Sequence, residues 1–286
     1  MHPTQITNWK RHVLAPLLLI NNSAFIKRLM TEVEGQSPSQ ASFVIGMHKG
    51  GSTMLHDFME TYIRQSKIKG ISISDKLFHK GVSDEQYGTD ESLLSLLNEK
   101  FVFYGFRYVP DFMLSNKSKF LNKRAIVLVR DPRDCVVSAY YSFLKSHVIP
   151  SEFESDAAKL VREERKLHQT SSIDDYALSE IHRFVEELCG YAYFAHENLR
   201  IFRYEDIIFN KRDFFRKVVN HLGLHWNNES FEFAVQTVDI IPDKERPDQH
   251  IRNVRPGNYK EKLRKSTIHL ISQHYGQVLA LYGYDH

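Results

Sequence analysis

A short loop with two adjacent glycines, two hydroxyls and one lysine is the first segment whose residue types indicate chemistry. Residues 46–53 read GMHKGGST. Glycines let the backbone approach an anion closely, and free N–H groups at the start of a helix can hold phosphate oxygens. The loop predicts an anion site formed by Lys49, Gly50, Gly51, Ser52 and Thr53. The alternative is a tight strand-to-helix turn that Ser52 merely caps.

The position of the lysine limits which phosphate compound the loop can take. A triphosphate-binding loop, GxxxxGK[ST], has its lysine directly after the last glycine, and the next hydroxyl holds magnesium. Ser52 occupies the place of that lysine, and Lys49 stands three residues earlier. The cation must therefore reach the anion from within the loop. A donor in which one phosphate is joined to a sulfate fits this arrangement, and it requires no metal.

A second pair of anion-binding side chains follows an apolar run, AIVLV, that reads as a buried strand. Arg130 comes directly after this run, and Asp131 with Pro132 then forms a strong helix start, as N-cap and first helical residue. Arg130 is thereby placed at the carboxyl end of a strand, the edge where open α/β sheets bind ligands. Ser138 lies about two helical turns beyond the cap. Arg130 and Ser138 predict a second phosphate site; the alternative is a structural pair between Arg130 and Asp134.

A third basic segment precedes the last helical pattern. Residues 252–260 read RNVRPGNYK, in which Arg252, Arg255 and Lys260 flank a Pro-Gly turn. Arginine forks on such a turn suit closure over a bound phosphate. The alternative is an ordinary surface turn, because Pro-Gly marks turns in general.

Alternating apolar runs and helical patterns must position these three segments. The strands are expected at residues 42–46, 71–74, 101–106, 125–129 and 199–203. Helices are expected at residues 54–63, 132–146, 174–196, 211–222 and 258–281. Strands that alternate with helices predict a three-layer α/β fold, with a mostly parallel central sheet and helices on both faces.

The chain is expected to form one domain over residues 1–286, because no repeat or linker divides it. Residues 1–40 are interpreted as an N-terminal helical extension. The polar and charged stretch 147–173 lies where a lid or an acceptor-binding insertion would sit. A plain solvated helix and loop is the alternative for that stretch.

Composition and cysteine usage indicate a cytoplasmic protein without a nucleic-acid partner. The formal net charge is +3, with 26% charged residues and no long charge blocks. Cys135 and Cys189 show no metal-site or disulfide spacing, which suits a reducing compartment. Basic residues before the apolar run 13–20 imitate a signal peptide, but Pro16 and the lack of a cleavage site argue against export. The run is also too short for a membrane span, which needs ~20 residues.

Taken together and in this order, the three segments resemble the family of sulfotransferases that use 3′-phosphoadenosine 5′-phosphosulfate (PAPS). FVIGMHKGGSTML is similar to the family's 5′-phosphosulfate loop, IVLVRDPRDCVVSAYYSF to its 3′-phosphate segment, and RNVRPGNYKEKL to its RKGxxGxWK loop. Phe202–Asp206, FRYED, resembles an element that commonly follows a late strand. The resemblance spans about residues 42–265 and implies a fold like that of P-loop NTPases.

The resemblance also implies a role for each matched residue, in a reaction that releases 3′-phosphoadenosine 5′-phosphate (PAP). Lys49 would stabilise the charge that develops on the leaving phosphate. The rest of the loop, Gly50, Gly51, Ser52 and Thr53, would hold the 5′-phosphosulfate. Residues Arg130 and Ser138 would hold the 3′-phosphate, joined by Arg252 and Arg255. Tyr204 would lie near the adenine.

The general base is assigned from a second branch of the family. The cytosolic branch has a histidine after a middle strand, and Tyr108 occupies that place here. A neutral phenol is a poor base near pH 7. The Golgi-type branch uses a glutamate just after the second strand, in an ExxFF setting that Asp75-Lys-Leu-Phe78 resembles. Asp75 is therefore the first candidate base and His79 the second, with a surface carboxylate that caps a turn as the alternative for Asp75.

Two other functions remain open from the sequence. One is a magnesium-dependent P-loop kinase, against which the displaced lysine counts. The other is a non-catalytic nucleotide-binding member of the fold. The acceptor is expected to be a hydroxyl or amine of a small molecule, lipid or carbohydrate, and the sequence does not indicate the oligomeric state.

Overall fold

Five parallel strands form the centre of the computed structural model, which describes residues 22–142, 171–241 and 253–284. The strands are β1 (Ser42–Gly46), β2 (Gly70–Ser72), β3 (Val102–Phe106), β4 (Arg124–Val129) and β5 (Leu199–Arg203). They lie in the order β2-β3-β1-β4-β5, and every pairing is parallel. The predicted α/β class and parallel sheet are confirmed.

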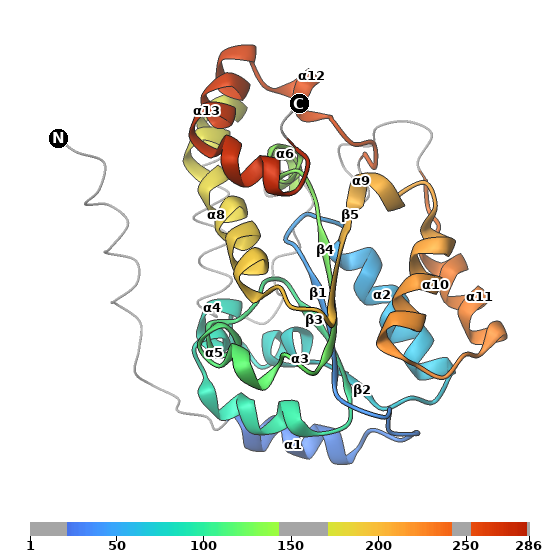
Figure 1. Cartoon of the computed structure of the whole chain (residues 1–286). Coiled ribbons are helices and arrows are strands. Elements are labelled where there is room, and N and C mark those ends of the chain that lie inside the picture. The colour runs from blue at the N-terminus through green and yellow to red at the C-terminus, as the bar shows by residue number, and fades with distance from the viewer. Residues whose placement is uncertain (1–21, 143–170, 242–252, 285–286) are drawn as a thin grey trace.

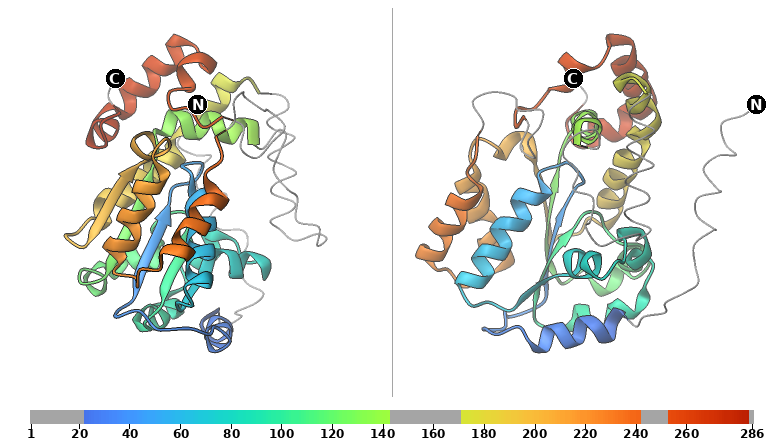
Figure 2. Two further views of the ribbon diagram at one scale, coloured as in Figure 1. Left: turned by 90° about the vertical axis from the view of Figure 1, so that its right-hand side faces the viewer. Right: turned by 180° about the vertical axis from the view of Figure 1, so that it is seen from behind.

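Helices cover both faces of this sheet, as Figures 1 and 2 show. One face carries α2 (Ser52–Gln65), α10 (Lys211–Leu222) and α11 (Asn228–Val238). The other face carries α1 (Asn22–Thr31), α3 (Ile73–His79), α5 (Asp111–Ser115), α6 (Pro132–Tyr141), α8 (Ile173–Phe194) and α13 (Lys265–Leu281). Short elements complete the described chain: α4 (Asp84–Gly88), η2 (Glu91–Asn98), η3 (Lys117–Lys119), α9 (Tyr204–Ile207) and α12 (Tyr259–Lys262).

The apolar strands explain why the fold has three layers. Successive side chains of a strand point to opposite faces of the sheet. Accordingly Phe43 and Ile45 of β1 belong to the core beneath α6 and α8, whereas Val44 belongs to the core beneath α2 and α10. Residues of β1 and β3 are buried throughout. Burial on both faces is what a near-continuous apolar run in a parallel sheet indicates.

Two element boundaries differ from the predictions. The second strand ends at Ser72 rather than at residue 74, because the Ser72 hydroxyl accepts a hydrogen bond from the Asp75 N–H and caps α3. Helix α11 was not predicted. The parts of the predictions that fall on residues 1–21, 143–170 and 242–252 lie outside the described residues; they include most of the expected lid and the start of the N-terminal extension.

Candidate active site

The connections of β1 and β4 leave the sheet in opposite directions. After β1 the chain crosses to β2 and β3, and after β4 it crosses to β5 on the other side. Neighbouring strands that diverge in this way create a crevice outside their carboxyl ends, where open α/β sheets bind ligands. The glycine-rich loop follows β1, and Arg130 follows β4. The topology therefore brings the first two predicted anion sites to one crevice.

The loop after β1 is shaped by two residues in the left-handed region. Lys49 has φ 57° and Gly51 has φ 91°. A side chain on Gly51 would also collide with the ring of Tyr204, since an added Cβ would lie 2.9 Å from Cδ2. Gly51, not Ser52, is the N-cap of α2, and no side chain of the described residues caps it. The first N–H groups of α2 therefore keep their capacity to bind an anion.

Lys49 points from this loop into a buried, positively charged environment. Its Nζ donates a hydrogen bond to the Ser142 hydroxyl at 2.9 Å. Burial, together with the nearby positive charges of Arg107 and Arg130, lowers the pKa of Lys49 to about 8. Such a lysine is stabilised as a cation when an anion arrives. Lys49 thus has the environment expected of a group that awaits a negatively charged ligand.

Arg130 lies beside the same loop and retains an unused donor. Its Nη1 donates to the carbonyl oxygen of Lys49 at 3.3 Å, and its guanidinium lies 4.4 Å from the ring centroid of Tyr204. The residue is 5% exposed, yet its Nε has no hydrogen-bond partner among the described residues. A buried donor without a partner is costly. A bound phosphate at this position would supply the missing acceptor.

The structural alternative for Arg130 is only partly realised. Arg130 Nη2 lies 3.6 Å from Asp134 Oδ2. The Asp134 carboxylate mainly accepts from backbone groups of the third basic segment: Gly257 N–H at 2.7 Å and Tyr259 N–H at 2.9 Å. Asp134 therefore ties this segment to the start of α6, which Arg130 immediately precedes.

The remaining predicted donor residues are placed less uniformly. Ser138 is half-buried on α6. Tyr204 lies under Arg130 and against Gly51, and its hydroxyl donates to the Val254 carbonyl at 3.0 Å. Arg255 is exposed, and Arg252 lies outside the described residues. The structure thus brings Lys49, the loop, Arg130 and Tyr204 together, and the adenine contact of Tyr204 stays a prediction.

The two candidate bases lie at a different part of the sheet edge. Asp75 is in the first turn of α3, and its carboxylate lies 3.5 Å from Nε2 of His79 one turn later. β3 separates β2 from β1, which places the ends of those strands ~10 Å apart across the sheet. β2 also ends about two residues, or ~7 Å, before Gly46. Asp75 therefore does not contact the Lys49 loop directly.

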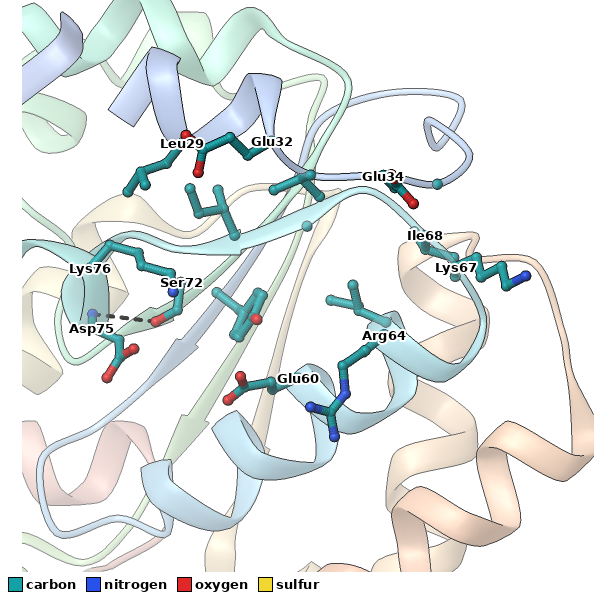
Figure 3. Close-up of a pocket in the computed structure, with 16 residues that line it drawn as sticks. Leu29, Glu32, Glu34, Glu60, Arg64, Lys67, Ile68, Ser72, Asp75 and Lys76 are labelled. Atoms are coloured by element: carbon teal, nitrogen blue, oxygen red, sulfur yellow. Dashed lines mark hydrogen bonds between the residues drawn. The ribbon is translucent and has the colours of Figure 1, made fainter. Parts of the chain in front are cut away.

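A cavity of about 630 Å³ opens beside Asp75 along the outer edge of β2. Figure 3 shows Ser72 and Asp75 at one end of this cavity and Lys67 and Ile68 at the other. Its wall includes Tyr104 of β3 and charged side chains of both signs from α1, α2 and α3. The volume is in the range of small-molecule sites, ~300–1,000 Å³.

Several polar residues of this region were not predicted as site residues. His56, one turn into α2, hydrogen-bonds Ser72 Oγ through Nε2 at 3.2 Å, so it lies between the loop and β2. His48 contacts Glu187, which is 139 positions away in the sequence. No local pattern reports a contact at such a separation. Tyr108, the alternative to a histidine base, donates its hydroxyl to the backbone carbonyl of Asp84.

The fold and the site first define a class: a P-loop-like α/β protein whose anion-binding groups gather at the carboxyl edge of its sheet. A family model described as the sulfotransferase domain matches residues 39–275. The chain therefore belongs to the sulfotransferase family. This confirms the resemblance stated from the sequence motifs and the predicted enzyme class, a PAPS-dependent sulfotransferase.

Solved structures share this fold at low sequence identity. Mouse sulfotransferase SULT7A1, complexed with PAP, is 12% identical, with a TM-score of 0.56 over 90% of this chain and 94% of that chain. Retinol dehydratase, in complex with androsterone and inactive cofactor PAP, is 16% identical, with a TM-score of 0.48 over 84% and 80%. A sulfotransferase from Alicyclobacillus acidocaldarius is 13% identical, with a TM-score of 0.41 over 84% and 92%.

No curated protein sequence matches this chain significantly. Among the helices of the described residues, none combines the length and apolar character that a membrane crossing requires.

Proposed function

We propose that the protein transfers the sulfuryl group of PAPS to a hydroxyl or amine of a small-molecule, lipid or carbohydrate acceptor and releases PAP. One observation supports this most directly. Arg130 is buried beside the Lys49 loop with its Nε unpartnered, so two cationic groups from two strand ends face one crevice. A ligand with phosphate groups at both ends of an adenosine has the charges that this pair requires.

The donor would be held by residues from three segments. Lys49 and the N–H groups of residues 50–53 would bind the 5′-phosphosulfate at the uncapped start of α2. Arg130 and Ser138 would bind the 3′-phosphate. The segment that Asp134 holds, which contains Arg255, would lie over that phosphate together with Arg252.

The reaction would need no covalent intermediate on the protein. A nucleophilic oxygen or nitrogen of the acceptor forms a bond to sulfur while the bond from sulfur to the bridging phosphate oxygen breaks. Lys49 stabilises the negative charge that develops on that oxygen, and positioning with electrostatic stabilisation supplies most of the rate increase. The acceptor proton passes to a base, for which Asp75 is the first candidate and His79 the second.

The acceptor would approach from the β2 edge. Asp75 lines the cavity there, and the cavity combines apolar side chains with charges of both signs. Such a lining suits an acceptor that has an apolar part and polar substituents. The free cysteines, buried Cys135 and exposed Cys189, are compatible with the proposed cytoplasmic location.

Transfer of labelled sulfate from PAPS to a panel of hydroxyl and amine acceptors tests the proposal. We expect labelled product without added metal. Calorimetric titrations with PAP and with ATP–Mg separate the alternatives: a kinase prefers ATP–Mg. A non-catalytic member binds PAP but gives no product with any acceptor.

A further inference from the structure

His48 stands directly before Lys49 and is held by carboxylates from two other elements. Its backbone N–H donates to Glu187 Oε2 at 3.0 Å, and its Nδ1 lies 2.6 Å from Glu187 Oε1. Its Nε2 lies 3.5 Å from Asp84 Oδ2. Glu187 comes from α8 and Asp84 from α4. We call His48, Glu187 and Asp84 the His48 clasp.

The charges of the clasp favour a protonated ring. Burial opposes a charge on His48, but Glu187 and Asp84 outweigh it and raise the pKa of His48 to about 9. A protonated imidazole donates from both nitrogens, and each nitrogen here faces a carboxylate. His48 is therefore an imidazolium at neutral pH whose two N–H groups are both in use.

The clasp connects the two ends of the site. Asp84 Oδ1 accepts a hydrogen bond from Ser74 Oγ at 3.3 Å, and Ser74 directly precedes Asp75 on α3. On the other side, Tyr191 of α8 donates to the Arg107 carbonyl at 2.8 Å and lies 3.4 Å from Glu187 Oε2. A continuous set of polar contacts thus runs from the residue before Lys49 to the residue before Asp75.

We propose that His48 is a positioning residue that holds Lys49 and Asp75 at a fixed separation, through Glu187 and through Asp84. This inference rests on the proposed function, which assigns those two residues to the transfer. His48 itself touches no reacting group, since both of its ring nitrogens are occupied. Transfer between two bound groups depends steeply on their spacing, so loss of the clasp should lower turnover more than donor binding.

Steady-state kinetics and PAP titrations on four variants test this split. His48→Ala should lower kcat by about 10- to 100-fold, while the Kd for PAP changes far less, because Arg130 and the loop N–H groups remain. Glu187→Gln should give an intermediate loss, because its amide oxygen still accepts from the His48 N–H. His48→Gln should recover part of the loss. His182→Ala, an exposed histidine on the same helix as Glu187, is the matched control and should change neither constant.

An unchanged kcat in folded His48→Ala, or a loss of PAP affinity as large as the loss of kcat, would overturn the positioning role. A second measurement avoids turnover altogether. The imidazole carbon signal of His48, assigned by its absence in His48→Gln, should titrate near pH 9 in the wild type and move toward the ordinary value in Glu187→Gln. This result stands even if the donor is wrongly assigned. A wild-type midpoint near 6.5, or no response to Glu187→Gln, contradicts the clasp.

Discussion

The two ends of the active site are built differently. At the donor end, Arg130 is 5% exposed and contacts the Lys49 loop, Tyr204 and Asp134. At the acceptor end, the side chains of Asp75 and His79 are 42% and 73% exposed and pair mainly with each other. The donor end is fixed by buried contacts between distant elements, whereas the acceptor end lies beside an open cavity.

This difference has a physical meaning for the reaction. Buried cations fixed in place can stabilise developing charge without reorganising, which is the arrangement that catalysis of group transfer favours. An exposed carboxylate beside a cavity can meet acceptors of different shapes, but it gains its geometry only when an acceptor binds. We therefore expect substitutions at the donor end to act on every acceptor alike.

The largest effect is expected from Lys49→Ala. Removing the cation that stabilises the leaving phosphate should lower kcat by about 10²- to 10³-fold, the cost typical of losing one transition-state donor. Single-turnover transfer of labelled sulfate measures this loss. Lys217→Ala, which removes an exposed lysine on α10, should retain wild-type kcat. Equal rates for the two variants would remove Lys49 from the chemistry.

Asp75→Asn should have the next largest effect. The amide cannot take the acceptor proton, so kcat should fall by about 10²-fold, near the lower limit for loss of a general base. His79→Gln should cost far less if Asp75 is the base. The reverse order, with the larger loss in His79→Gln, would transfer the role to the histidine. Either outcome sharpens the acceptor end of the comparison.

Arg130→Ala should act chiefly on donor affinity. The loss of a charged hydrogen bond to phosphate should weaken binding by roughly 1.5–3 kcal/mol, with a smaller change in kcat. Calorimetric titration with PAP measures the change, and Arg183→Ala on the exposed face of α8 serves as control. Wild-type affinity in Arg130→Ala would show that its buried Nε does not face the nucleotide.

The smallest effect is a pH dependence of donor capture. Burial and the neighbouring arginines lower the pKa of free Lys49 to about 8, so the cation is lost as pH rises through that value. The ratio kcat/KM for PAPS should therefore fall above about pH 8. A bound anion favours the charged lysine, so kcat itself should fall only at higher pH. Coincident pH limits for both constants would argue against an anion next to Lys49.

The donor end was largely predictable from the sequence because its signals are local. An apolar run fixes where β1 and β4 end, and the residues that follow must then lie at the carboxyl edge of the sheet. This reasoning placed Lys49 and Arg130 in one crevice. The boundary between β2 and α3 was wrong by two residues, since the apolar pattern continues through Ile73 and only the cap made by Ser72 ends the strand.

The contacts that join the elements were not predictable. Asp134 reads as a helix residue, yet it binds backbone groups more than 120 positions later. His48 reads as a loop residue, and its partner Glu187 lies on a helix whose sequence shows only an amphipathic pattern. Such contacts depend on packing in three dimensions, which residue types and spacing do not report.

A crystal structure with PAP bound is the most direct test of the central claim, that one nucleotide spans both anion sites. We expect the 5′-phosphate to contact Lys49 and the N–H groups of residues 50–53, and the 3′-phosphate to accept from Nε of Arg130. A nucleotide bound elsewhere, or a 3′-phosphate that Arg130 does not contact, would contradict the account.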